Sequence, residues 1–229
     1  VATPGVFLQM KEIADAIQAN FPDFCDTIYC KSAGTLPNTG TDYFLFGTKA
    51  DTVAKENNIL FSVNWVEGQK TGFFLDQREN RKLLGEFSKG KKVLNTFCYT
   101  GGFSIYAMNA GAELVTSVDI SQKAVDLAAS NMELNFPNAN HKAVADDVFN
   151  FMKEHTQQYD VIVLDPPAFA KSIKSKHTAT QAYKRLNIAG LKALAPNGIL
   201  FTFSCSQVID DVLFYNTVAA AAIESGRNI

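Results

Sequence analysis

Long apolar runs, a secretion leader and paired-cysteine motifs are all missing from this sequence of 229 residues. No apolar run approaches the ~20 residues that span a bilayer, so we expect no membrane partner. The first five residues, Val1 to Gly5, lack the basic-then-apolar pattern of a signal peptide, which favours a cytoplasmic location. They also lack an initiator Met, so we expect the chain to start within a longer protein or to follow processing.

Cysteine is scarce and poorly spaced for metal binding. The four cysteines, Cys25, Cys30, Cys98 and Cys205, form no C-x-x-C pair, and no Cys/His cluster has the spacing of zinc ligands. Reduced thiols are the rule in the cytosol. The sequence therefore predicts neither a metal site nor a structural disulfide.

The formal net charge is only -2, so the whole molecule is no polycation, and an apolar share of 47% excludes a disordered chain. One segment departs from this balance, because no Asp or Glu lies between Pro166 and Ile209. We interpret its basic residues as RNA contacts, with a partnerless basic loop as the alternative. The proposed contacts are Lys171, Lys174, Lys184 and Arg185.

Two regions differ in pattern. Residues 1–75 predict a small α+β domain, with a helix over Met10–Phe21 and four short strands. The strands are expected at Thr27–Lys31, Tyr43–Gly47, Ile59–Trp65 and Thr71–Leu75.

Residues 76–229 alternate strand and helix, which predicts an α/β domain with a doubly wound, mostly parallel, Rossmann-like sheet. Its strands are expected at Lys92–Thr96, Leu114–Val118, Lys142–Ala145, Tyr159–Leu164 and Ile199–Ser204. Helices are expected at Phe103–Asn109, Ser121–Leu134, Val148–His155, Thr178–Leu194 and Asp210–Ser225.

Ligands of such sheets bind at the carboxyl ends of the strands. There the sequence places Thr100-Gly101-Gly102, whose missing β-carbons would let a ligand approach, and then Asp119, suited to the two hydroxyls of a ribose. No G-x-G-x-x-G phosphate turn is present. A nucleoside cofactor without phosphates fits better, and S-adenosylmethionine is the obvious one. Asp147, or Asp146 beside it, would then meet the adenine; a helix N-cap is the alternative.

Asp165-Pro-Pro-Ala-Phe169 ends the fourth strand. Pro166 and the proline after it have no N–H to donate, which leaves carbonyls and a carboxylate facing a planar substrate. Phe169 could stack on that substrate. A proline-rich turn with a core phenylalanine is the alternative. Cys205 ends the fifth strand and is a candidate nucleophile, since thiolate attack at C6 of cytosine activates C5 for methylation. A small core thiol is the alternative there.

Four segments together resemble one family. They are Gly68 to Arg78, Val93 to Phe103, Asp165 to Phe169 and Phe203 to Ser206, and the family is that of the bacterial large-subunit ribosomal RNA cytosine-C5 methyltransferases. The resemblance implies a class I methyltransferase fold and S-adenosylmethionine as cofactor. It implies that Asp165 faces the target base and that Cys205 is the nucleophile. It further implies a cofactor site made by Lys70, Gln77, Arg78, Phe97, Tyr99, Thr100, Gly101, Asp119 and Asp147.

Departures from that family leave alternatives open. The chain holds no RNA-binding PUA segment and stops at Ile229, so we expect the C-terminal strands of the sheet to lie outside it. Ala168 stands where other RNA cytosine methyltransferases carry a second cysteine, which leaves the base for the C5 proton unassigned. One alternative is N-methylation of guanine or an exocyclic amine in RNA, and another is a non-catalytic RNA-binding module. The oligomeric state stays open.

Overall fold

The computed structural model describes residues 3–36, 38, 40–170 and 172–227. It divides the chain into two compact units. The first comprises Val1–Glu56 and Ser62–Asp76, and the second comprises Asn57–Phe61 and Gln77–Ile229. The chain passes between them within the hairpin of β3 (Asp51–Glu56) and β4 (Ile59–Asn64).

The first unit packs two helices and a hairpin. Helix α1 (Pro4–Leu8) begins after Thr3, whose hydroxyl accepts a hydrogen bond from the Val6 N–H, and α2 (Met10–Asn20) follows. Strands β1 (Ile28–Cys30) and β2 (Tyr43–Phe46) lie within the expected strand segments, and they pair antiparallel. In the same unit the Lys31 ammonium donates to three carbonyl oxygens, of Trp65, Val66 and Gly68, at 2.6–3.1 Å.

The strand expected at Thr71–Leu75 is wrong. The segment is a turn, in which Gly72 has φ +88° and its N–H donates to the Gln69 carbonyl at 2.8 Å. A β-carbon on Gly72 would lie 2.6 Å from the Asn64 carbonyl oxygen, so the backbone folds back onto the end of β4. A short 3-10 helix, η1 (Leu75–Gln77), completes the turn.

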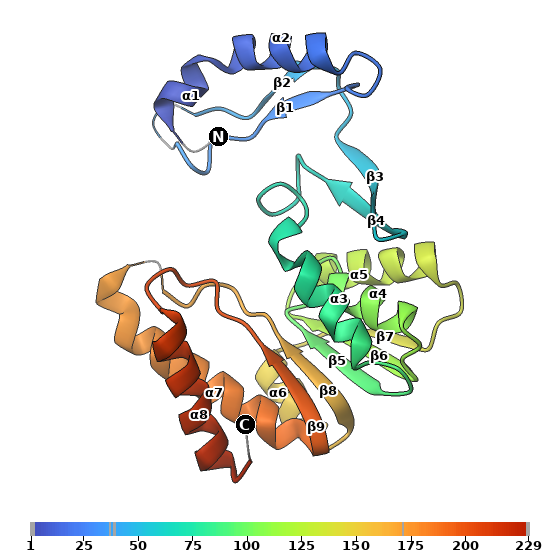
Figure 1. Cartoon of the computed structure of the whole chain (residues 1–229), viewed down its shortest axis with the longest axis vertical. Coiled ribbons are helices and arrows are strands. Elements are labelled where there is room, and N and C mark those ends of the chain that lie inside the picture. The colour runs from blue at the N-terminus through green and yellow to red at the C-terminus, as the bar shows by residue number, and fades with distance from the viewer. Residues whose placement is uncertain (1–2, 37, 39, 171, 228–229) are drawn as a thin grey trace. The chain divides into compact units, whose positions relative to one another are not determined.

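The second unit is built on a parallel five-stranded sheet of order β7-β6-β5-β8-β9 (Figure 1). Its strands are β5 (Lys92–Thr96), β6 (Leu114–Asp119), β7 (His141–Ala145), β8 (Tyr159–Leu164) and β9 (Leu194–Thr202). The chain runs outward from β5 to β7 and then returns to β8 on the other side of β5. This reversal is the switch point beside which ligands of such sheets bind, and the Rossmann-like prediction is confirmed.

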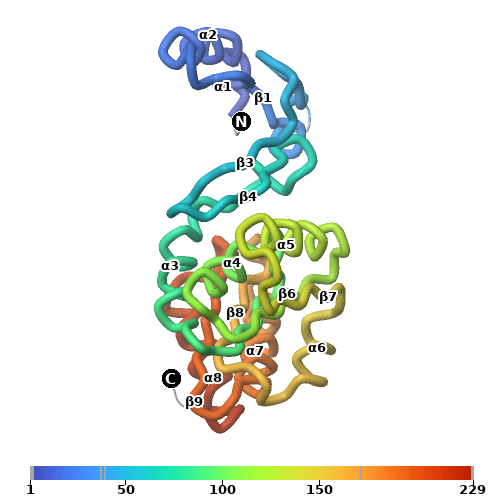
Figure 2. Tube along the Cα trace, turned by 90° about the vertical axis from the view of Figure 1, so that its right-hand side faces the viewer, coloured from blue at the N-terminus to red at the C-terminus, as the bar shows by residue number. Residues whose placement is uncertain are grey.

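Helices cover both faces of this sheet, and Figure 2 follows the same path as a tube. They are α3 (Arg78–Glu86), α4 (Gly102–Asn109), α5 (Gln122–Asn135), α6 (Val148–Glu154), α7 (Lys176–Ala193) and α8 (Asp211–Ser225), with the short η2 (Ile173–Ser175) before α7. One core cluster joins inward side chains of β5, β6 and β8, among them Leu94, Val118 and Ile162, to α6 and α7. These strands are buried almost throughout, as a sheet with two covered faces requires.

Strand β9 begins five residues before the expected Ile199. Pro196-Asn-Gly198 was expected to end the preceding helix outside the sheet, but this segment bulges within the strand. Tyr159 pairs with Leu194 and Val161 with Ile199, so the bulge absorbs the extra residues, and Asn197 adopts φ +60° in it.

Candidate functional site

The carboxyl ends of all five parallel strands meet at one edge of the sheet, as the sequence predicts. The loop of residues 97–101 follows β5, Asp119 ends β6, Asp146 and Asp147 follow β7, and Asp165 follows β8. Cys205 lies three residues beyond β9. The sheet therefore brings the expected donors and acceptors of the second unit to a single edge, whereas their individual roles stay predictions.

The loop between β5 and α4 is held in an unusual backbone conformation. Phe97, Tyr99 and Gly101 have φ values of +54°, +44° and +75°. A positive φ costs a side-chain-bearing residue on the order of 1–3 kcal/mol and is concentrated at ligand sites. The carbonyl of buried Thr100 accepts a hydrogen bond of 3.0 Å from the amide of Asn131, a fully buried residue of α5. Asn131, which the sequence analysis missed, therefore helps to fix this loop.

The structure explains why glycine stands at positions 101 and 102, and the explanation differs from the expected one. A β-carbon on Gly101 would lie 2.9 Å from the β-carbon of Ala128 on α5, so Gly101 is required for packing against that helix. A β-carbon on Gly102 would lie 3.0 Å from Cδ of Arg81. Both β-carbon positions thus face the protein's own side chains, and a close approach of the cofactor to this backbone stays a prediction.

Arg81 is a second residue that the sequence analysis missed. It lies on α3, is only 3% exposed, and its guanidinium carbon is 6.0 Å from the centre of the Tyr106 ring on α4. Arg81 thus packs against the start of α4, the helix after the loop of residues 97–101, whereas its neighbour Arg78 is exposed.

Asp119 is half-buried and well oriented. Its Oδ2 accepts from the Tyr99 N–H at 3.2 Å and its Oδ1 from the Ser121 N–H at 3.0 Å. Ser121 in turn caps α5, as expected. Burial raises the pKa of the neighbouring Cys98 thiol, and the Asp119 carboxylate raises that pKa further. Cys98 is therefore a neutral core thiol although it lies in the loop.

Asp147 is the N-cap of α6, the alternative that the sequence left open. Its Oδ1 accepts from the N–H groups of Phe149 and Asn150, both at 3.0 Å. Asp146 accepts from the N–H of Asp147 at 2.7 Å, and its own N–H donates to the Asp119 carbonyl at 3.1 Å. The cap fixes the carboxylate of Asp147 at the strand edge, and its contact with an adenine stays a prediction.

The residues expected at the methionine end of the cofactor contact other side chains in the structure. Gln77 accepts from the Asn80 amide at 2.7 Å, and Arg78 donates to Asn57 at 3.1 Å. Lys70 belongs to the first unit, where its ammonium lies 4.8 Å from the centre of the Phe74 ring. Their roles in cofactor binding stay predictions.

The ends of β8 and β9 present the expected substrate groups. Asp165 is half-buried, Pro166 is buried and Cys205 is exposed. The Cys205 thiol lies 3.6 Å from the Pro166 carbonyl oxygen, to which it donates. Phe169 is half-buried, and its ring centre lies 4.7 Å from that of Tyr183. Phe169 therefore packs partly in the core, as the alternative interpretation of this segment expected, and its stacking on a base stays a prediction.

The basic segment is less one-sided in space than in sequence. The Lys184 ammonium lies 2.7 Å from the Glu224 carboxylate, and that of Lys176 lies 3.3 Å from Asp210. Both acids come from α8 or its N-cap, which the sequence separates from the lysines. Lys174 and Arg185 are exposed, whereas Lys171 lies outside the described residues.

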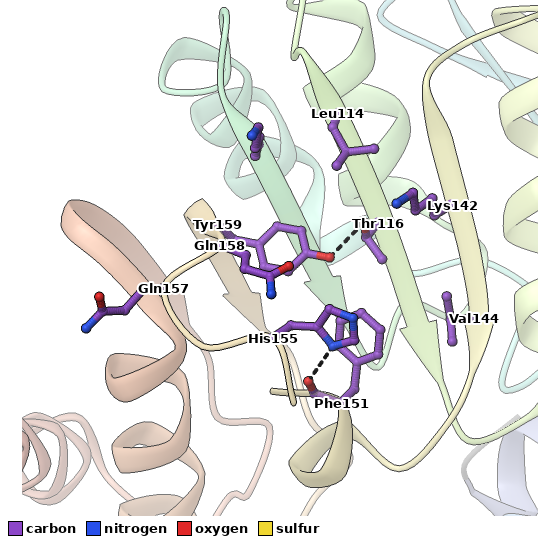
Figure 3. Close-up of a pocket in the computed structure, with 10 residues that line it drawn as sticks. Leu114, Thr116, Lys142, Val144, Phe151, His155, Gln157, Gln158 and Tyr159 are labelled. Atoms are coloured by element: carbon purple, nitrogen blue, oxygen red, sulfur yellow. Dashed lines mark hydrogen bonds between the residues drawn. The ribbon is translucent and has the colours of Figure 1, made fainter. Parts of the chain in front are cut away.

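A cavity of about 400 Å³ lies at the opposite, amino-terminal edge of the sheet (Figure 3). Lys92, Leu114 and Tyr159, the first residues of β5, β6 and β8, contribute to its lining. The Lys92 ammonium is 4.0 Å from the carboxylate of Glu113, which does not line the cavity. Because ligands of doubly wound sheets bind at the other edge, this cavity is not part of the candidate site.

Neither a metal centre nor a membrane span is found in the described part of the chain. No group of three or more His, Cys, Asp or Glu residues among those positions could hold a metal ion. Within the same residues, no helix has both the length and the apolar character needed to cross a bilayer.

Comparison with known proteins shows the family to which the chain belongs. The family described as S-adenosylmethionine-dependent methyltransferase matches residues 37–224. The chain belongs to this family. S-adenosylmethionine, the cofactor expected from the strand-end residues, is the cofactor that defines these methyltransferases.

Two curated relatives are both named Ribosomal RNA large subunit methyltransferase I. That of Aeromonas hydrophila is 38% identical over 237 residues, covering 100% of this chain and 60% of the relative. That of Vibrio vulnificus is 40% identical over 236 residues, covering 98% and 59%. The chain thus spans about three fifths of the length of these relatives.

A solved structure extends the comparison to three dimensions. SMU.776, described as a methyltransferase complexed with SAH, superposes with a TM-score of 0.79 at 30% identity. The match covers 94% of this chain and 57% of that one. It supports the methyltransferase fold over nearly the whole chain.

The residues at the strand edge fit this cofactor. Asp119 offers carboxylate oxygens, which suit ribose hydroxyls and would repel a phosphate. The fixed backbone of residues 97–101 lies beside it, since Tyr99 donates to that carboxylate. A carboxylate at this position also suits the ribose of a dinucleotide, so it is the lack of a G-x-G-x-x-G phosphate turn in the sequence that favours a nucleoside cofactor.

Proposed function

We propose that this chain carries the catalytic part of an S-adenosylmethionine-dependent methyltransferase that forms 5-methylcytosine in large-subunit ribosomal RNA. The observation that carries the proposal is the exposed thiol of Cys205, which lies 3.6 Å from the Pro166 carbonyl oxygen. It stands at the same sheet edge as Asp119. The names of the relatives from Aeromonas and Vibrio support ribosomal RNA as the substrate.

In the proposed reaction Cys205, as the thiolate, adds to C6 of the cytosine. The bond electrons of C5=C6 become available at C5, which is otherwise too weak a nucleophile to accept a methyl group. S-adenosylmethionine would supply the electrophilic methyl group to C5 and leave as S-adenosylhomocysteine. The C5 proton then leaves to water, the C5=C6 bond re-forms, and the C6–S bond breaks to return the Cys205 thiolate.

Asp165 has the position to hold the base during this sequence. It follows β8 directly and is half-buried, and Pro166 and Pro167 after it have no N–H to donate. We assign the Asp165 carboxylate to the exocyclic amino group and N3 edge of the cytosine. Lys174 and Arg185, both exposed, are the basic residues best placed for phosphate contacts.

The test uses the protein as its gene encodes it, with labelled S-adenosylmethionine and RNA from cells lacking the enzyme. Mass spectrometry of the nucleosides should find 5-methylcytidine with the wild type and none with Cys205→Ala. Cys25→Ala is the matched control, since Cys25 lies in the first unit, and it should retain activity. RNA containing 5-fluorocytidine should trap a covalent adduct on Cys205, because a C5–F bond cannot release a proton.

A second candidate reaction is N-methylation of guanine or an exocyclic amine in RNA. The observation in its favour is the half-buried Asp165 followed by Pro166 and Pro167, a carboxylate suited to an amine. A methylated guanosine that forms equally well with Cys205→Ala would establish this reaction and refute the covalent route. Cofactor binding with no methylation of any RNA would favour a non-catalytic RNA-binding module.

A further inference from the structure

Tyr183 joins the two loops that carry the proposed catalytic groups. It lies on α7, between β8 and β9 in the chain, and its side chain is fully buried. Its hydroxyl lies 2.9 Å from that of Ser206, the residue after Cys205. Its ring centre lies 4.7 Å from that of Phe169, which belongs to the loop after β8. One buried side chain therefore contacts both loops.

Ser206 connects these loops directly. It is only 3% exposed, and its hydroxyl oxygen accepts from the Ala170 N–H at 3.2 Å while bonding to Tyr183. The loop after β9 is thus tied to the end of the loop after β8. Because the peptide unit between Cys205 and Ser206 is planar, fixing Ser206 restricts where the Cys205 thiol can lie.

Tyr183 is itself held in place from two further directions. The Phe214 ring of α8 packs edge-on against it, with ring centres 5.5 Å apart and planes at 85°. The amide of Asn187, another fully buried residue of α7, donates to the Tyr183 carbonyl at 2.9 Å. The Tyr183 hydroxyl is therefore a fixed anchor for Ser206.

We propose that Tyr183 and Ser206 are positioning residues that aim the Cys205 thiol at C6 of the target base. The inference rests on the proposed function, because it concerns the same nucleophile. Neither side chain would touch the substrate. Their effect is on geometry, and a misplacement of about 1 Å at a reacting atom can cost about 100-fold in rate.

The test compares Tyr183→Phe with Tyr159→Phe in the whole protein. Tyr159 is a matched control because it is also buried, and its hydroxyl donates to Thr116 at 3.0 Å at the opposite end of the sheet (Figure 3). Each variant loses one buried hydrogen bond, so each Tm should fall by a similar amount, about 2–4 °C. Tyr183→Phe should lower kcat at least tenfold with a twofold or smaller change in cofactor Kd. Tyr159→Phe should change kcat less than twofold.

Ser206→Ala breaks the same tie from the other side and replaces the tyrosine variant if that one does not fold. The double variant with Tyr183→Phe should be no slower than Ser206→Ala alone, since Ser206→Ala already removes the hydrogen bond to Tyr183 together with the one from the Ala170 N–H. Equal kcat values for Tyr183→Phe and Tyr159→Phe, or independent effects in the double variant, would overturn the inference.

A second readout separates this inference from the proposed function. Iodoacetamide alkylation of Cys205, followed on its peptide by mass spectrometry, needs no RNA and no assumption about the methylated atom. Releasing Ser206 should change the Cys205 alkylation rate at least threefold in Tyr183→Phe and leave it unchanged in Tyr159→Phe. If the wild type forms no 5-methylcytidine, the proposed function fails, and this rate alone decides whether Tyr183 positions the thiol. Equal rates in the two variants refute positioning.

Discussion

Gly101 is the most sharply constrained residue of the cofactor loop, and replacing it with alanine tests the packing argument. Its φ of +75° costs an alanine about 1–2 kcal/mol. The added β-carbon would lie 2.9 Å from the β-carbon and 3.1 Å from the α-carbon of Ala128, and overpacking of this kind costs about 1–3 kcal/mol. We therefore expect Gly101→Ala to lower the free energy of unfolding by about 2–5 kcal/mol.

Gly90→Ala separates the two contributions. Gly90 has a similar φ of +68°, but its β-carbon would meet nothing within 4 Å, so only the backbone cost of about 1–2 kcal/mol remains. Urea unfolding of both variants should show Gly101→Ala as the less stable. Calorimetric titration should show at least tenfold weaker S-adenosylmethionine binding for Gly101→Ala alone. Equal stability losses would refute the packing argument, and equal cofactor affinities would refute the role of the loop.

Three further predictions concern single polar groups. Asp119→Asn should weaken cofactor binding by about 10- to 100-fold, the worth of a charge-assisted hydrogen bond, and unchanged affinity by titration would exclude the ribose contact. Asp147→Ala removes the N-cap of α6 and should lower the free energy of unfolding by about 1 kcal/mol, whereas Asp147→Ser should keep most of that stability. Weaker cofactor binding by Asp147→Ser would then report the loss of the adenine contact alone, because the cap is retained. Burial lowers the pKa of His141 to about 4, so the neutral ring is favoured in the folded state. The free energy of unfolding should be highest above pH ~6.5 and should fall by about 1–2 kcal/mol as the pH drops toward 4, after discounting for the partial exposure of the ring. Urea unfolding across this pH range should show a flatter pH dependence for His141→Gln.

The sheet of the second unit could be predicted because its strands are buried on both faces. Tyr159–Leu164 is apolar almost throughout, and turn residues end each strand, so the places of the strands in the chain and the edge where their carboxyl ends meet follow from the sequence. Two elements had no such signal. Strand β3 alternates exposed and half-buried residues, but polar and apolar side chains occur in both sets, and α3 is dense in charge and has no side-chain cap. Both depend on their neighbours in space.

The site shows the same division between local and distant causes. Asp119 and Cys205 could be identified because each follows a predictable strand, and the cap at Asp147 was foreseen as an alternative. Asn131, Arg81 and Ser206 act on loops that are 31, 21 and 36 residues away in the chain. No spacing rule connects residues so far apart, and only the packed helices α3, α5 and α7 bring them together.

The contacts around the cofactor loop also explain how a strained backbone persists there. Tyr99 adopts φ +44°, and its N–H is held by the Asp119 carboxylate, while the buried amide of Asn131 holds the next carbonyl, that of Thr100. Hydrogen bonds to charged groups contribute about 1.5–3 kcal/mol, enough to offset the backbone strain of about 1–3 kcal/mol. The carboxylate assigned to the ribose is thus also a support of the loop. A ligand that binds Asp119 in this same orientation finds the loop already ordered. Little of its binding free energy is therefore lost in ordering the backbone.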